Sequence, residues 1–252
     1  MTHRESGSVF LYILIGIVLF TALAYAVTQS IRMSDTSGDK NFGTSEKLDL
    51  YVSDIQQFLD SLKMRVFDAE NTSGIAETAL DFKNDVYLLS NSTAISENIN
   101  AACASDACHI FSPYNPQGLT PLIFFNAADT PDQTTATLPK NGHGRIRQIA
   151  IKGVGSAAPD LVFVIYGIAP HICNRYNEKM GITTNYTTAT TLTSLGENST
   201  TSQPEAFTGT YNGTHDFGNG ATGFTGKKSF CAPAYGDAEN HRLAIWHVLK
   251  VR

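Results

Sequence analysis

Residues 45–69, SEKLDLYVSDIQQFLDSLKMRVFDA, carry the clearest periodic pattern in the chain. Apolar side chains recur there every three or four residues, which is the spacing of one face of an α-helix. Thr44 or Ser45 can cap the N-terminal end of this helix. The pattern predicts an amphipathic helix that packs on its own domain through the following residues: Leu48, Tyr51, Ile55, Phe58, Leu59, Leu62 and Val66.

The second half of the chain has the composition of β-strands separated by turn residues. A short helix is predicted at residues 171–180, because Pro170 precedes this segment and Gly181 follows it. The last stretch is apolar on both faces, as expected of a strand inside a sheet. We therefore expect an α+β domain in which the amphipathic helix packs on a mainly antiparallel sheet. The predicted strands are residues 122–125, 145–151, 160–166 and 243–251.

Residues 183–225 are rich in Thr, Ser, Asn and Gly and contain hardly any large apolar side chain. A segment of this composition buries little apolar surface. It is therefore predicted to be a long loop of the domain that spans residues 45–252.

Residues 9–27, VFLYILIGIVLFTALAYAV, contain no charged side chain. Nineteen residues form about 28 Å of helix, close to the roughly 30 Å of a bilayer core. The segment has no polar face, and it carries a tyrosine near each end, where aromatic residues meet the membrane surface. It is predicted to be a single transmembrane helix. The residues that mark this anchor are Val9, Tyr12, Gly16, Tyr25 and Val27.

The flanking residues suggest how the chain is arranged across the membrane. Arg4 lies before the anchor, which favours a cytoplasmic leader at residues 1–8. Residues 28–44 form the predicted linker, because their second part, SDTSGDKNFGT, is polar and contains glycine. The domain of residues 45–252 is then expected outside an inner membrane, in the periplasm or at the cell surface.

The leader RESG at residues 4–7, followed by SVFL at residues 8–11, resembles the N-terminus of type IV pilin-like and pseudopilin-like proteins. In that family a peptidase cuts after the glycine, which here is the bond between Gly7 and Ser8. The resemblance implies a pilin-like lollipop fold. It also implies a structural, non-enzymatic subunit of a surface filament or secretion apparatus, which meets copies of itself or related subunits through the N-terminal helix. Tyr12 stands where major pilins carry Glu, and some minor pilins and pseudopilins also lack that Glu.

Shorter stretches are similar to a group of single-pass alphaproteobacterial proteins. That resemblance implies location and lineage, and no activity. It rests on AYAVTQS at residues 24–30, CHIF at residues 108–111, ICN at residues 172–174 with Gly181 and Ile182, and HVL at residues 247–249.

Two other fates of the anchor stay open. Ala24, Tyr25 and Ala26 fit the small-x-small cleavage site of a secretory signal peptide. The segment can also remain uncut as a signal anchor. Either outcome favours the alternative function, a monomeric bitopic or secreted binding module that uses residues 183–225 to hold its partner.

All four cysteines, Cys103, Cys108, Cys173 and Cys231, lie beyond the anchor. An even number in an oxidising compartment favours disulfides, and three pairings are possible. We favour Cys103 with Cys108 and Cys173 with Cys231. The second pair closes a loop of 58 residues, which stabilises the fold by roughly 4 kcal/mol in the chain-entropy model.

Other chemistry has little support in the sequence. Cys103, Cys108 and His109 have the order of a covalent haem site, but four residues separate the cysteines where two are usual. A local disulfide is favoured, and no cofactor is predicted. A phosphate loop, a nucleophile elbow and a helical His pair are absent, so no catalytic residue or metal ligand is predicted. The net charge of -5, with scattered Lys and Arg, gives no nucleic-acid footprint.

Overall fold

The computed structural model describes residues 45–87, 99–128, 140–183, 206–213, 216–217, 223–233 and 243–252. The chain divides into two units, Met1–Asp49 and Leu50–Arg252, and nearly all of the first unit lies outside the described residues. The predicted cleavage site at Gly7 and Ser8, the anchor and the linker therefore lie outside them as well. Among the helices that are described, none is long and apolar enough to cross a membrane.

The predicted amphipathic helix is confirmed as α2, Ser45–Asn71. It has 27 residues, and its apolar stripe is buried from the second turn onward. Successive members of the stripe are three or four residues apart, except for the adjacent Phe58 and Leu59, so they share one face of the helix. These buried residues are Val52, Ile55, Phe58, Leu59, Leu62, Val66 and Ala69.

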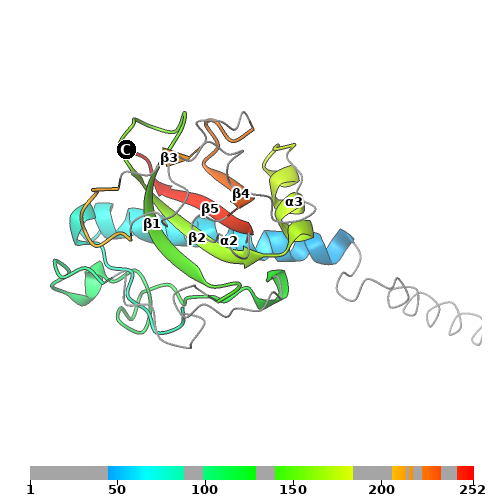
Figure 1. Cartoon of the computed structure of the whole chain (residues 1–252). Helices are drawn as coiled ribbons and strands as arrows, with labels where there is room; N and C mark the ends of the chain where they lie inside the picture. Colours follow the sequence, from blue (N-terminus) through cyan, green and yellow to red (C-terminus); the bar gives the residue numbers. More distant parts are fainter. Residues whose placement is uncertain are drawn as a thin grey trace, which may run out of the picture. The chain divides into compact units, whose positions relative to one another are not determined.

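The described part of the chain then forms a five-stranded sheet, in the order β3-β1-β2-β5-β4 (Figure 1). All neighbouring strands are antiparallel except β1 and β3, which are parallel. The predicted α+β class is confirmed, and so is the interior position of the last strand. The strands are β1 (Gly144–Ile151), β2 (Asp160–Ile168), β3 (Asp216–Phe217), β4 (Ser229–Pro233) and β5 (Leu243–Lys250).

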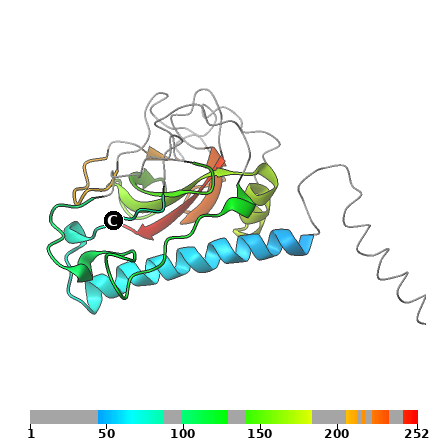
Figure 2. The same ribbon diagram turned by 90° about the horizontal axis from the view of Figure 1, so that it is seen from below.

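Both helices cover one face of this sheet (Figure 2). Phe58 on α2 meets Phe163 on β2, with ring centroids 5.7 Å apart. The second helix, α3 (Pro170–Lys179), confirms the predicted short helix. It lies beside the N-terminal part of α2, where Lys179 Nζ donates to Ser53 Oγ at 3.2 Å. The helices and the sheet therefore enclose one core.

Aromatic rings cover the opposite face of the sheet. Trp246 on β5 lies in register with Phe230 on β4. Phe217 lies 5.6 Å from Trp246, and Phe224 lies 5.1 Å from Phe230, between ring centroids. All four side chains are at most 1% exposed. Phe217 and Phe224 come from residues 183–225, so the expectation that this segment lacks core residues is wrong for its described part.

The prediction of a strand at residues 122–125 is also wrong. This segment pairs with no strand of the described residues, and its end forms a single 3-10 turn, Phe125–Ala127. Phe124 packs edge-on against Phe58 of α2, with 5.5 Å between ring centroids. The apolar run therefore packs against a helix instead of joining the sheet.

Candidate functional site

A short parallel bridge brings two distant segments together at Asp81 and His109. Asp81 N donates to Cys108 O at 3.0 Å, and Ile110 N donates to Asp81 O at 2.9 Å. The side chains of Asp81 and His109 thereby lie next to each other, although 28 positions separate them in the sequence.

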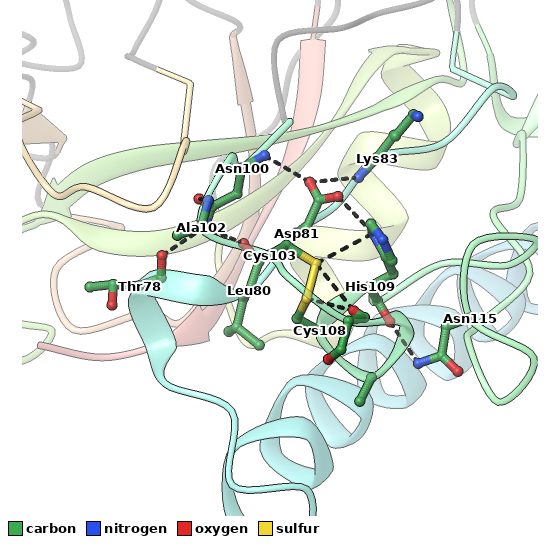
Figure 3. The surroundings of a disulfide bond; sticks show 12 residues. Thr78, Leu80, Asp81, Lys83, Asn100, Ala102, Cys103, Cys108, His109 and Asn115 are labelled. Carbon is green, nitrogen blue, oxygen red and sulfur yellow. Dashed lines mark hydrogen bonds and ion pairs between the residues drawn. A yellow bond between two sulfur atoms is a disulfide. The ribbon is translucent and has the colours of Figure 1, made fainter.

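The Asp81 carboxylate is buried, with 2% of its side chain exposed. Its Oδ2 accepts a hydrogen bond from His109 Nδ1 at 2.7 Å. Its Oδ1 accepts hydrogen bonds from the backbone N–H groups of Asn100 at 3.0 Å and Lys83 at 3.3 Å. Both oxygens are therefore held in fixed directions, with Oδ2 aimed at the imidazole (Figure 3).

The Cys103–Cys108 disulfide lies against the same imidazole ring (Figure 3). Cys103 Sγ is 3.7 Å from His109 Nδ1. The two half-cystines differ in accessibility: Cys103 is partly exposed, whereas Cys108 is 2% exposed. An external reagent therefore reaches the Cys103 sulfur more easily. The predicted pairing of these cysteines is confirmed.

Several contacts fix the segment that carries His109. Asn115 Nδ2 donates to His109 O at 2.9 Å, and the ring of Tyr114 lies 5.6 Å from the imidazole. The hydroxyl of Tyr114 donates to the Asp85 carboxylate, and this hydrogen bond raises the Tyr114 pKa above its usual value. Lys83 Nζ lies 4.3 Å from the centre of the Tyr114 ring. The imidazole is therefore held from several sides.

The side chains around His109 include three atoms that could bind a metal ion. One of them, the Cys103 sulfur, is already bonded to Cys108. Among the described residues, one group of His, Cys, Asp and Glu side chains brings three ligand atoms within 4.8 Å of one another: Asp81, Cys103 and His109. In the disulfide form Cys103 has no thiolate to offer. The same bond leaves neither sulfur available to attach a porphyrin, so the geometry does not support the haem interpretation.

A groove runs between α2 and the segment that was predicted as a strand. Its volume is about 610 Å³. Apolar walls come from Phe58 and Tyr51 on α2 and from Leu122 and Phe124 on the opposite side, and Asp54 adds a carboxylate. Leu122 is 44% exposed, so an apolar wall of the groove faces solvent.

The outer surface of α2 also exposes apolar side chains. Leu50 and Met64 are each 58% exposed, and Phe67 is 56% exposed. Because each residue advances about 100° around a helix, these three residues lie roughly opposite the buried stripe. We call Leu50, Met64 and Phe67 the outer apolar face of α2.

The second predicted disulfide, Cys173–Cys231, is confirmed as well. It joins α3 to β4, and both cysteines are fully buried. The two disulfides therefore differ in their surroundings. Cys173–Cys231 lies in the core, whereas Cys103–Cys108 is partly exposed to solvent and lies next to ionisable side chains.

Comparison of the chain with protein-family models found no match, and searches of curated proteins and of solved structures found no significant similarity. The proposed function therefore rests on the residues, on their geometry and on the resemblance at residues 4–11.

Asp81 was missed by the sequence reasoning, although Cys103, Cys108 and His109 were all considered. No local motif surrounds Asp81, and the short bridge to His109 involves a single residue of each segment. The available signal was weak: an isolated acidic residue lies between the apolar Leu80 and Phe82.

Proposed function

We propose that the chain is a membrane-anchored structural subunit, pilin-like or pseudopilin-like, of a surface filament or secretion apparatus. One observation carries the proposal: a 27-residue helix, α2, lies along one face of a mainly antiparallel sheet. In the sequence, α2 begins directly after the predicted linker. This is the order that the resemblance at residues 4–11 implies for a domain behind an N-terminal anchor.

The outer apolar face of α2 supports a role in assembly. Apolar surface costs free energy in water, at about 25 cal/mol for each Å². Leu50, Met64 and Phe67 are each more than half exposed, and the adjacent groove adds further apolar surface. We propose that a neighbouring copy or a related subunit covers this side of α2, while residues 9–27 make the main contact inside the membrane.

Processing at the leader tests the proposal. The full chain is expressed in a bacterium that has a pilin-type peptidase, and the N-terminus of the membrane-purified protein is read by mass spectrometry. We expect Ser8 as the first residue. Replacement of Gly7 by Val should block the cut, whereas the matched change Gly16→Val in the anchor should leave it intact. An N-terminus that still includes Met1 contradicts the filament role.

Assembly is tested separately with single cysteines. Met64→Cys places a thiol on the outer apolar face of α2, and a thiol-specific cross-linker should join copies of this variant in membranes. Glu178→Cys is the control, since the Glu178 side chain is 68% exposed and belongs to α3, a different helix. Equal cross-linking of both variants contradicts a specific contact.

The groove favours a second candidate, a monomeric binding module. Its apolar walls and single carboxylate suit a small or peptidic ligand with an apolar body. Residues 183–225, the binding segment expected from the sequence, lie mostly outside the described residues. Cleavage after Ala26, together with a monomer in solution, favours this candidate over the filament subunit.

A further inference from the structure

The partly exposed Cys103–Cys108 disulfide lies next to the His109 imidazole and the buried Asp81 carboxylate (Figure 3). We propose that reduction of the Cys103–Cys108 disulfide creates a zinc-binding site whose ligands are Cys103 Sγ, His109 Nδ1 and a carboxylate oxygen of Asp81. This site is separate from the outer apolar face of α2, and it does not depend on the proposed function.

The distances suit a tetrahedral ion. Zinc bonds to sulfur, nitrogen and oxygen at about 2.0–2.3 Å, which places neighbouring ligand atoms about 3.5 Å apart. Cys103 Sγ and His109 Nδ1 are already 3.7 Å apart. His109 Nδ1 and Asp81 Oδ2 share a proton at 2.7 Å, and this gap must open by less than an ångström, about 0.8 Å, when an ion replaces that proton.

The surroundings of Asp81 prepare it as a ligand. Two backbone N–H groups hold Oδ1, so Oδ2 is left for the imidazole or for an ion. Outer hydrogen bonds of this kind orient ligands and strengthen metal sites. Reduction places the Cys103 thiol beside a buried negative charge, and a divalent cation neutralises both the carboxylate and a thiolate.

The donor set selects the metal. One thiolate, one imidazole and one carboxylate suit zinc, whereas calcium and magnesium prefer oxygen ligands alone. The disulfide form lacks the thiolate, so its affinity for zinc is expected to be low. The oxidation state of Cys103 therefore decides whether the ion is held.

The redox step needs an external dithiol. The dithiol gives two electrons and two protons, the bond between Cys103 and Cys108 breaks, both sulfurs become thiols, and the dithiol becomes a disulfide. Zinc then displaces the thiol proton of Cys103 into solvent. The proton that His109 Nδ1 shares with Asp81 leaves Nδ1 and is replaced, through solvent, by a proton on Nε2, so that Nδ1 can bind the ion. Because Cys173 and Cys231 are fully buried, a mild dithiol treatment reduces the Cys103–Cys108 disulfide first.

Zinc titration of the full-length protein in detergent tests the site. The protein is reduced with a dithiol, freed of reductant without oxygen, and titrated with zinc against a chromophoric chelator. We expect one zinc per chain, bound at least 100-fold more tightly than by the oxidised protein. Asp81→Asn and His109→Gln should each weaken binding at least tenfold. Equal affinity in the oxidised and reduced states overturns the proposal.

Two cysteine variants form a matched pair, because both lack the disulfide and they differ only in the sulfur that remains. Cys108→Ser should bind zinc without prior reduction, whereas Cys103→Ser should bind weakly in every state. If Cys103→Ser binds as tightly as Cys108→Ser, the assigned ligand is wrong.

A measurement on the unaltered chain covers the case in which a variant does not fold. Zinc should slow alkylation of Cys103 in the reduced protein at least tenfold, as read by mass spectrometry of the modified peptide. Unchanged alkylation in the presence of zinc also overturns the proposal.

Discussion

The side chain of Asn177 on α3 forms two hydrogen bonds with the backbone of Cys231 on β4. They replace the two hydrogen bonds that a neighbouring strand would make. Its Nδ2 donates to Cys231 O at 2.8 Å, and its Oδ1 accepts from Cys231 N at 2.7 Å. Among the described residues β4 is the last strand of the sheet, so one edge of its backbone has no strand partner there. Asn177 is fully buried and satisfies this edge, one helical turn from the disulfide that Cys173 forms with Cys231.

Replacement of Asn177 by Ala should therefore lower the free energy of unfolding by about 2–3 kcal/mol, because a buried N–H and a buried C=O lose their partners. Urea unfolding of the purified protein measures this loss. Glu178→Ala on the same helix is the control, and it should cost less than about 0.5 kcal/mol, because its ion pair with Arg175 is exposed. Similar losses for both variants contradict the role given to Asn177.

Two phenylalanines on α2 give a second matched comparison. Phe58→Ala removes the ring that contacts Phe163 and Phe124, so it should cost about 3–5 kcal/mol of stability. Phe67→Ala removes a ring that is 56% exposed, and it should change the stability by less than about 0.5 kcal/mol. Thermal unfolding measures both, and an equally large loss for Phe67→Ala contradicts the assigned orientation of α2.

The two disulfides should contribute unequally to stability. The double replacement Cys173→Ala with Cys231→Ala opens a loop of 58 residues, and it should cost about 4 kcal/mol by chain entropy. The double replacement Cys103→Ala with Cys108→Ala opens a loop of five, and it should cost about 2 kcal/mol. Urea unfolding measures both, and the reverse order contradicts the prediction.

Buried histidines should make the protein less stable in mild acid. Burial, with a smaller effect of Lys140, lowers the pKa of His143 to about 4. Burial, with a smaller effect of Lys63, lowers the pKa of His247 to about 4. An unfolded histidine has a pKa of about 6.5, so the unfolded chain binds more protons between these values. The stability that the neutral forms of His143 and His247 contribute is therefore fully present above about pH 6.5, and it is lost as the pH falls toward 4.

Asp160 should offset part of this loss. Burial raises the pKa of Asp160 to about 6, so the folded chain binds the extra proton at this site below that pH. His247→Gln should therefore flatten the fall in stability between pH 6.5 and 4 by on the order of 2 kcal/mol, and Asp160→Asn should steepen it. Urea unfolding at several pH values measures the slopes. An unchanged slope in His247→Gln contradicts the assignment.

Segments with a strong local pattern were predicted correctly from the sequence. The three- and four-residue spacing from Ile55 to Val66 is a property of the helix itself, so it fixed α2 without knowledge of the sheet. The apolar residues on nearly both faces of β5 likewise indicated a strand with neighbours on both sides. Cys103 and Cys108 are close enough in the chain for their pairing to be expected.

The failures all depend on distant partners. Residues 122–125 look like a strand, but Phe124 packs on α2 and the segment pairs with no strand in the described part of the chain. Phe217 and Phe224 are single apolar residues among polar ones, and only the sheet that they cover explains their burial. Asp81 acquires its place in the candidate site through a bridge to His109, which no local pattern predicts.

The bond between Cys173 and Cys231 also changes what a protease can do to this domain. The chain between them, residues 174–230, is held at both ends by one buried covalent link. Cleavage of any peptide bond between the two cysteines therefore yields a nicked molecule of unchanged mass, apart from one added water, instead of two separate fragments. Such a nick leaves β5, with the C-terminus, joined to the rest of the domain.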